Sequence, residues 1–365
     1  MKLPKLDFVV EMIGGIEPAK TYIEQAITKG THVITANKEL MAFHGEELRR
    51  MAELAGVRLA YEASVAGAIP VIRTIQELLQ VNQVTQIHAI MNGTTNYILT
   101  QMRERKIPFE QALLEAQEKG YAESDPSNDI EGWDPFFKLM VLSDLVFDEQ
   151  PNWNQVEREG IEQVTLEQLT IAEQFGLRLK LIASLYKTEL GWNAKVTPTF
   201  LSQSHPLYTV EGVDNGIVLE TDLAGRLFFQ GAGAGAYATA SAIIEDLINI
   251  WQRRELGLQN KGTKWKPIHQ KRKVQNDWII IQSSRRKGKN EGILVKSRLQ
   301  QFGLKIHGIE KRENIHESAI GAVISGDSDN LNQFQYQVKE EQVQIYPILG
   351  WPEQHDRENV TSNFA

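Results

Sequence analysis

The chain has 365 residues, of which 42% are hydrophobic and 24% are charged, and its formal net charge is −8. This length allows two or three domains with sizeable cores, and the composition is that of an ordinary globular protein. The acidic balance disfavours nucleic acid and acidic membranes as partners. The absence of cysteine excludes disulfides and thiolate metal sites, and no apolar run approaches the ~20 residues that span a bilayer. The opening residues are too short and broken for a signal peptide, so we predict a cytoplasmic protein.

The first part of the chain alternates predicted strands and helices. Strands are predicted at 6–13, 31–35 and 58–62, and helices at 18–29, 39–55 and 69–79. This alternation is typical of a parallel α/β sheet. A dinucleotide-binding fold normally opens with a strand, a glycine-rich turn and a helix that cradles the pyrophosphate, whereas this sequence starts at what corresponds to the fourth strand. We therefore expect residues 1–80 to form a partial Rossmann-like parallel sheet whose N-terminal half is missing.

The middle of the chain predicts an α+β domain over residues 81–251. Strands are predicted at 83–91, 178–187, 193–199, 216–221 and 226–230, and helices at 95–105, 108–119, 135–147, 166–174 and 237–251. The glycine-rich run 231–236 stands between the last strand and the last helix, where a dinucleotide turn could be sought. No parallel strand follows that helix, so we reject this interpretation.

The last part of the chain begins with a basic segment. Eight basic residues and one acid between Arg253 and Lys273 predict an exposed linker over 252–276. Strands at 278–282, 304–309, 319–324 and 342–347, with helices at 293–302 and 330–337, then follow the β-α-β-β-α-β order of a ferredoxin-like unit. We place this unit at 277–350 and expect a disordered tail over 351–365.

The polar stretch from Lys119 to Lys138 carries the strongest chemical signal. Pro135 suits the first position of a helix, which would make Asp134 the N-cap and put Lys138 one turn later on the same face. An acid and an amine held side by side suit proton transfer. The helix dipole and burial would lower the pKa of Lys138, while Asp134 and Glu123 would raise it, and the residues alone leave the net direction open. They also leave open an ordinary Asp–Lys pair on a capped surface helix.

This stretch resembles the substrate-site signature of homoserine dehydrogenases, Gly-Tyr-x-Glu-x-Asp-Pro-x-x-Asp-x-x-Gly-x-Asp-x-x-x-Lys, with every fixed position present. The resemblance implies that Lys138 gives and takes the proton at the substrate oxygen, and that Asp134 supports that lysine and the substrate. It also implies that Glu123 binds the amino acid, that Asp129 lines the same pocket and that Gly120 meets the substrate through its backbone.

Three further segments resemble the same family in the same order. Thr35-Ala-Asn-Lys38 is similar to the segment that contacts the nicotinamide end of the cofactor, which implies cofactor-binding roles for Thr35 and Lys38. Gly93-Thr-Thr-Asn-Tyr-Ile98 is similar to a segment beside the substrate, so Thr94 is a substrate-binding candidate; read alone, Thr94 or Thr95 is a good N-cap. The run 231–242 is similar to a segment that folds back on the cofactor site, which makes Gly233 and Gly235 contact candidates.

Residues 61–70 resemble the family's alkali-cation loop. The resemblance implies that backbone carbonyl oxygens bind Na⁺ or a similar ion, which is reasonable because hard cations prefer oxygen ligands. The alternative is a tight glycine turn that enters a helix. The carbonyls belong to the positions Glu62, Val65, Gly67 and Ile69. The eight histidines are scattered, and we assign no transition metal.

The function implied by the resemblance is reversible NAD(P)-dependent oxidation of L-homoserine to L-aspartate 4-semialdehyde, a step of threonine and methionine biosynthesis. The resemblance also implies a homodimer or a higher homo-oligomer, and the sequence leaves the oligomeric state open. Many members carry a small regulatory amino-acid-binding (ACT) domain at the C-terminal end, which the unit at 277–350 resembles in topology. The rival hypothesis is a catalytically silent remnant that binds an amino acid or oligomerises, because no phosphate-cradling turn is found. The choice between NAD and NADP stays open, since the residue that reads the ribose would lie in the missing half.

Overall fold

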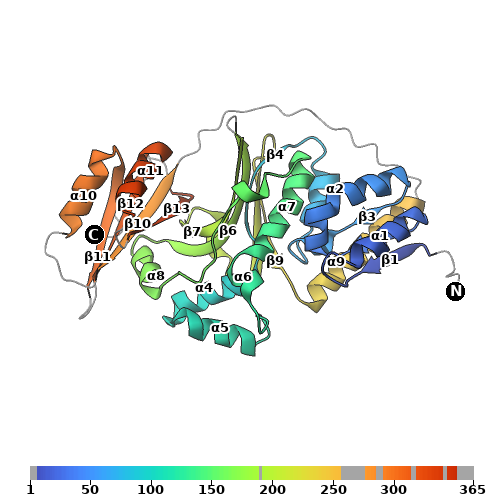
Figure 1. Ribbon diagram of the computed structural model, residues 1–365, viewed down its shortest axis with the longest axis horizontal. Coiled ribbons are helices and arrows are strands. Elements are labelled where there is room, and N and C mark those ends of the chain that lie inside the picture. Colours follow the sequence, from blue (N-terminus) through green and yellow to red (C-terminus); the bar gives the residue numbers. More distant parts are fainter. Residues whose placement is uncertain are drawn as a thin grey trace.

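The computed structural model describes residues 6–188, 191–255, 276–284, 291–313, 318–339 and 343–351. These residues form an elongated molecule with a small parallel sheet at one end, a large mixed sheet through the middle and the C-terminal elements at the other end (Figure 1). The expected α/β class is therefore confirmed.

The N-terminal sheet has three parallel strands in the order β1-β2-β3. Helices α1 and α2 cover one face, where apolar side chains such as Ile23 and Leu48 pack with Val33 of β2. Helix α9, far along the chain, covers the other face with Ile243 and Ile250. The bounds are β1 (Phe8–Glu11), α1 (Ala19–Thr28), β2 (His32–Thr35), α2 (Lys38–Leu54), β3 (Leu59–Ala60) and α9 (Ala236–Glu255).

Two predicted elements of this region differ from the structure. The strand predicted at 58–62 stops at Ala60, because the chain turns into the short 3-10 helix η1 (Glu62–Ser64). The helix predicted at 69–79 is a single turn of α3 (Val71–Arg73) that continues as a wider π-helix, η2 (Thr74–Leu78). The Glu62 carboxylate accepts hydrogen bonds from the backbone N–H groups of Ile72 (2.8 Å) and Arg73 (2.7 Å), so it satisfies the first turn of α3.

The large sheet has the strand order β11-β12-β10-β13-β7-β6-β4-β8-β9, with the short β5 paired to β7. Its middle strands were predicted, whereas β5 and the short helix α6 were not. Helices α4, α7 and α8 contact strand β6. The bounds are β4 (Val84–Ile90), α4 (Gly93–Arg105), α5 (Phe109–Glu118), α6 (Ser127–Ile130), α7 (Trp133–Phe147), η3 (Trp153–Gln155), β5 (Glu157–Arg158), α8 (Leu166–Glu173), β6 (Arg178–Thr188), β7 (Gly191–Leu201), η4 (Pro206–Thr209), β8 (Asp214–Thr221) and β9 (Arg226–Ala232).

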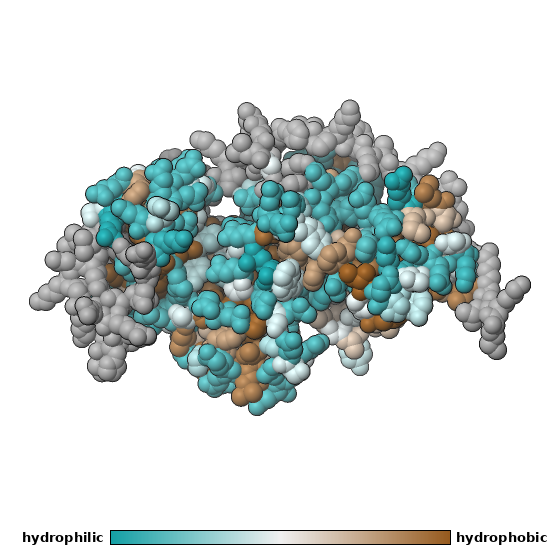
Figure 2. All heavy atoms as spheres, viewed as in Figure 1, coloured by the Kyte–Doolittle hydropathy of each residue, from teal (hydrophilic) through white to brown (hydrophobic). Residues whose placement is uncertain are grey.

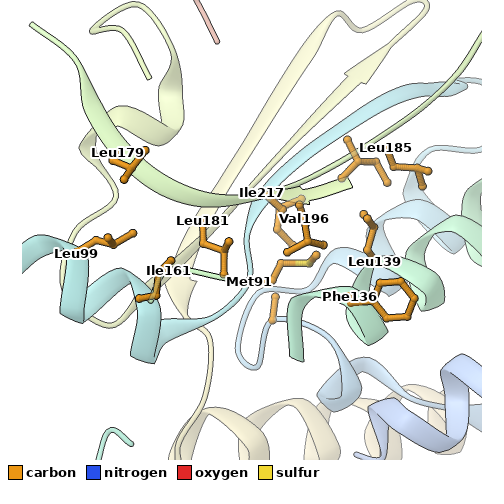
Figure 3. Close-up of a cluster of buried hydrophobic side chains, with 14 of the residues drawn as sticks. Met91, Leu99, Phe136, Leu139, Ile161, Leu179, Leu181, Leu185, Val196 and Ile217 are labelled. Atoms are coloured by element: carbon orange, nitrogen blue, oxygen red, sulfur yellow. The ribbon is translucent and has the colours of Figure 1, made fainter. Parts of the chain in front are cut away.

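The main core lies between this sheet and its helices. Leu139 of α7 lies beside Met91, which follows β4, and Val196 of β7, with Ile217 of β8 close by (Figure 3). All four side chains are buried. Their apolar contacts hold α7 rigidly against the end of β4, which is where the polar residues of the candidate site meet.

The C-terminal elements follow the predicted β-α-β-β-α-β order. Their strands pair antiparallel in the order β11-β12-β10-β13. Strand β13 also pairs in parallel with β7, so the sheet continues across the predicted domain boundary. The predicted linker beyond residue 255 and the tail beyond 351 lie outside the described residues. The bounds are β10 (Asp277–Ser284), α10 (Glu291–Gln301), β11 (Lys305–Glu313), β12 (Ser318–Ser325), α11 (Ser328–Gln337) and β13 (Val343–Leu349).

The surface seen in Figure 2 is mainly hydrophilic, with smaller hydrophobic areas between the polar ones. Among the described residues, none of the helices combines the length and the apolar character that crossing a membrane requires.

Candidate active site

Helix α7 starts two residues earlier than predicted. Its N-cap is Gly132, which has a φ of 83°, and the helix runs from Trp133. The N–H of Phe136 donates to the Gly132 carbonyl at 3.2 Å, which closes the first turn. The prediction that Asp134 is the N-cap was therefore wrong, although Pro135 still lies where a missing N–H removes no helical hydrogen bond. Because Asp134 caps nothing, its carboxylate is available for other partners.

Asp134 is the hub of a buried polar cluster and is only 4% exposed. Its Oδ1 accepts a hydrogen bond from Lys38, the first residue of α2, and its Oδ2 accepts one from Lys138 Nζ at 2.8 Å. Asn92 Nδ2 donates to the same Oδ2 at 3.0 Å. The two lysines come from helices of different regions, so the site forms where α2 meets α7.

The Lys138 amine is held inside the protein rather than in solvent. The residue is 8% exposed, and its Nζ donates to the Met91 carbonyl at 2.7 Å as well as to Asp134. These bonds use two of the three hydrogens of an ammonium group and leave the third for a bound molecule. The structure thus confirms the predicted Asp–Lys pair and excludes the surface-pair interpretation.

The surroundings of the cluster shift the pKa values of the two lysines in opposite directions. Burial lowers the pKa of Lys138 and the Lys38 cation adds to this effect, against the opposing pull of Asp134, so the net shift is downward. Burial also lowers the pKa of Lys38, but Asp134, Asp129 and Glu123 together outweigh it, and the net shift is upward. The pKa of Asp134 is lowered although burial alone would raise it, because both lysines stabilise its charge. The cluster therefore keeps a Lys38–Asp134 ion pair and a Lys138 amine that gives up its proton more easily than an exposed lysine does.

The predicted substrate residues lie around this cluster. Asp129 of α6 accepts a hydrogen bond from Asn92 Nδ2 at 2.7 Å, and burial and the Asp134 charge raise its pKa. Glu123 is exposed and lies close enough to Lys38 to raise its pKa. Thr94 donates its hydroxyl to the Tyr121 carbonyl at 2.6 Å, so it also ties α4 to the loop that carries Glu123. Gly120 has a φ of 72°, which favours glycine there.

The helix that carries Thr94 is capped by neither of the predicted residues. Asn92 is the N-cap of α4, and its Oδ1 accepts hydrogen bonds from the Thr95 N–H (2.8 Å) and the Thr95 hydroxyl (2.9 Å). The N-cap prediction for Thr94 or Thr95 was therefore wrong. Asparagine is as good a cap as threonine, and its place after a strand was the signal that sequence reasoning missed.

A second missed residue is Glu11, at the end of β1. It is 3% exposed, and its Oε2 accepts a hydrogen bond of 2.5 Å from the Thr35 hydroxyl. Its Oε1 accepts one from the Ile13 N–H at 2.6 Å. The Thr35 oxygen in turn accepts the Asn37 N–H at 3.0 Å, so the ends of β1 and β2 form one rigid edge beside Lys38. Ligands bind at this edge in parallel α/β sheets.

The predicted cation loop contacts the glycine-rich run after β9. Ala66 and Gly67 have left-handed backbone with φ of 56° and 54°. A side chain on Gly67 would come within 2.6 Å of the Gly233 carbonyl, so only glycine allows this approach. Gly235 has a φ of 101°. Helix α9, which follows these two glycines, packs on β2, the strand that ends at Thr35.

This arrangement can move a proton. A buried amine with a lowered pKa and a free N–H lies beside a fixed carboxylate, at the end of a parallel sheet that suits a nucleotide.

Comparison with family models gives two matches. Residues 70–248 match the model described as homoserine dehydrogenase, and residues 1–62 match the model described as homoserine dehydrogenase, NAD binding domain. A homoserine dehydrogenase from Lactococcus lactis is 44% identical over 258 residues, which are 71% of this chain and 60% of that protein. The chain thus spans about three fifths of the length of this curated relative.

Solved structures of similar proteins agree. A homoserine dehydrogenase from Thiobacillus denitrificans has a TM-score of 0.81 and 32% identity, with 94% of this chain and 82% of that chain covered. A hyperthermophilic archaeal homoserine dehydrogenase in complex with NADPH has a TM-score of 0.59 and 31% identity, covering 70% of this chain and 73% of that one.

Proposed function

The chain belongs to the homoserine dehydrogenase family, and we propose that it interconverts L-homoserine and L-aspartate 4-semialdehyde with NAD(P). The single observation that carries this proposal is the Lys38–Asp134–Lys138 cluster, which joins the end of the parallel sheet, beside β2, to helix α7. The activity, the substrate and the cofactor are all part of this proposal, because the chain spans only about three fifths of the length of the Lactococcus lactis relative.

In the oxidation direction Lys138 takes the proton of the substrate hydroxyl, while a hydride leaves the carbon that carries this hydroxyl. The nicotinamide cofactor, when bound, accepts that hydride and returns it in the reverse reaction. The lowered pKa of Lys138 makes the neutral form of this amine, which can accept the proton, more populated than in an exposed lysine at the same pH. The Met91 carbonyl and Asp134 hold the nitrogen in place, which leaves its lone pair or third hydrogen for the substrate.

The remaining residues hold the substrate and the nucleotide edge. Glu123 and Asp129 supply the negative charge that would pair with the substrate ammonium group. Thr35, fixed by Glu11, and Lys38 would meet the nicotinamide end, which the donor hydroxyl and the cation suit. Gly120 and Thr94 would shape the substrate loop, and Gly233 and Gly235 would close the cofactor side, as sequence resemblance implies.

The proposal is tested by mixing the chain with NADPH and aspartate semialdehyde and following NADPH absorbance at saturating cofactor. We expect turnover, and we expect Lys138→Ala to lower kcat by about 10²–10⁴-fold because a general acid is removed. Lys180→Met is a matched control: Lys180 is also buried, but its Nζ bonds to Asn96, Val210 and Glu211 rather than to the cluster. No turnover with cofactor and substrate both bound would favour the silent amino-acid-binding module instead.

An alkali cation is a further part of the proposal. Its ligands would be the backbone carbonyls of the four loop residues Glu62, Val65, Gly67 and Ile69. Support comes from Asn215, a buried side chain against Gly233 whose amide oxygen and nitrogen find no hydrogen-bond partner among the described residues. Such an orphaned amide fits beside an ion or its water. Titration with NaCl against choline chloride should raise the melting temperature only for sodium, and equal curves would remove the ion.

The C-terminal unit and the oligomer complete the proposal. We assign the β10–β13 unit to the ACT-like class on its strand order, and we propose a homodimer. Support for an interface comes from α9, where Tyr237 (94%), Ile244 (58%) and Trp251 (53%) lie exposed seven residues apart. Sedimentation equilibrium should give twice the mass of the chain, and a monomer at all concentrations would refute the dimer. Threonine binding, measured by calorimetry, would test the ACT-like assignment.

A further inference from the structure

Asn92 lies at the junction of β4 and α4 and touches both acids of the site. Its Nδ2 donates to Asp129 Oδ1 at 2.7 Å and to Asp134 Oδ2 at 3.0 Å, and the residue is 5% exposed. We propose that Asn92 is a positioning residue for proton transfer: its amide bridges the two carboxylates and fixes the oxygen that receives Lys138. The inference deepens the proposed function and rests on it for the identity of the transferred proton.

The orientation of the Asn92 amide is set by the helix it caps. Its Oδ1 must face α4, because the Thr95 N–H can only donate, and it does so at 2.8 Å. The Nδ2 therefore has to face the acids, and each of its two hydrogens has one carboxylate acceptor. A flipped amide would place an oxygen against two carboxylates and leave the Thr95 N–H unpaired, so only one orientation is satisfied.

Two consecutive residues, Met91 and Asn92, thus bind both members of the Asp–Lys pair. The Met91 carbonyl accepts from Lys138 Nζ at 2.7 Å, and the next residue, Asn92, donates to the Asp134 oxygen that Lys138 also uses. Met91 is buried in the main core, so these two residues cannot shift without disturbing the packing. The separation of amine and carboxylate is therefore held from outside the pair.

The bridge also biases the charge of the amine. The Asn92 N–H occupies a lone pair of Asp134 Oδ2, the oxygen that also accepts a hydrogen bond from Lys138 Nζ. Sharing this acceptor weakens the stabilisation that Asp134 offers to a charged Lys138. The bridge further offsets the repulsion between Asp129 and Asp134, which lets both acids stay in one pocket. Removing the amide should therefore raise the pKa of Lys138 and loosen Asp129.

The test compares Asn92→Ser and Asn92→Asp with the parent chain. Serine and aspartate both cap helices well, so α4 keeps its first turn while the bridging NH₂ group is lost. Asn152→Asp is the matched control, because Asn152 caps the short helix η3 and its side chain bonds to Asn154 alone among the described residues. The readout is the pH titration of Lys138 by NMR of ¹³C-lysine protein, with its signal assigned by its loss in Lys138→Arg.

We expect the Lys138 midpoint to rise in Asn92→Ser, and to rise by about one pH unit or more in Asn92→Asp, where a negative charge replaces the amide. Asn152→Asp should leave it unchanged. With turnover, the rising limb of the kcat/KM profile for homoserine oxidation should move to higher pH by the same amount. An unmoved midpoint in both Asn92 variants overturns the proposal.

A second measurement needs no variant. In the parent chain the two Asn92 side-chain N–H protons should exchange slowly with solvent, and their shifts should follow the Lys138 midpoint. Fast exchange, or shifts that ignore that midpoint, would equally overturn the bridge. Neither readout requires catalysis, so a chain without dehydrogenase activity refutes the proposed function and still decides the role of Asn92.

Discussion

Replacing Asp134 by asparagine is the sharpest test of the buried cluster. The substitution keeps the shape of the side chain and removes the negative charge that forms ion pairs with both Lys38 and Lys138. Lys38 has 42% of its side chain exposed, so solvent screens its charge and its loss of a partner costs little. The main effect should fall on Lys138, of whose side chain only 10% is exposed.

The magnitude follows from the proton that Lys138 must give up. Without Asp134, burial and the Lys38 cation lower the pKa of this amine further from the ordinary 10.5 that it has in the unfolded chain. Complete loss of the proton on folding would cost about 5 kcal/mol at about pH 7 and about 1.4 kcal/mol at about pH 9.5, so these figures are the upper limits of the effect. Breaking a buried pair costs about 3–5 kcal/mol, which lies within the first limit. Because the unfolded state binds more protons, the variant regains stability as the pH rises.

The assay is urea unfolding of the parent and variant at both pH values. Asp144→Asn provides the control, since Asp144 lies on the same helix, is 5% exposed and pairs with Arg49 at 2.6 Å. Arginine stays protonated throughout, so this deficit in unfolding free energy should be the same at both pH values. If the Asp134→Asn deficit also fails to shrink at high pH, Lys138 is not the group that loses its proton.

Two further predictions test other parts of the structure. Gly67→Ala should lower the unfolding free energy by about 2–3 kcal/mol, because Gly67 has a left-handed φ and the added Cβ would meet Gly233. Gly56 is the control: its φ is also left-handed but its surroundings are open, so Gly56→Ala should cost about 1 kcal/mol, and equal losses in the two variants would refute the contact. Burial lowers the pKa of His88 to about 3, so stability should fall as the pH drops below about 6.5, by about 2 kcal/mol at about pH 5. Thermal melts of His88→Gln should lose this share of the acid sensitivity, whereas His44→Gln, partly exposed on α2, should keep it.

Local chemistry made much of this protein predictable from its sequence. The alternation of apolar and polar runs indicated the parallel sheet, the middle strands and the β-α-β-β-α-β order, because strand and helix periods are properties of neighbouring residues. The pairing of Asp134 with Lys138 was equally predictable, since residues four apart share a helix face. The start of α7 was misplaced because Gly132, in a left-handed conformation, competes as a cap with Asp134.

Only the tertiary structure decided how the pair is used. Lys38 reaches Asp134 across 96 positions of sequence, and Lys138 reaches the Met91 carbonyl across 47. Neither hydrogen bond follows from local spacing in the sequence, because both depend on how α2 and α7 pack and on where β4 ends. The burial that lowers the pKa of Lys138, and the Asn92 amide that spans two acids, arise from the same packing. The sequence determined which groups could react, and the packing determined their charge and orientation.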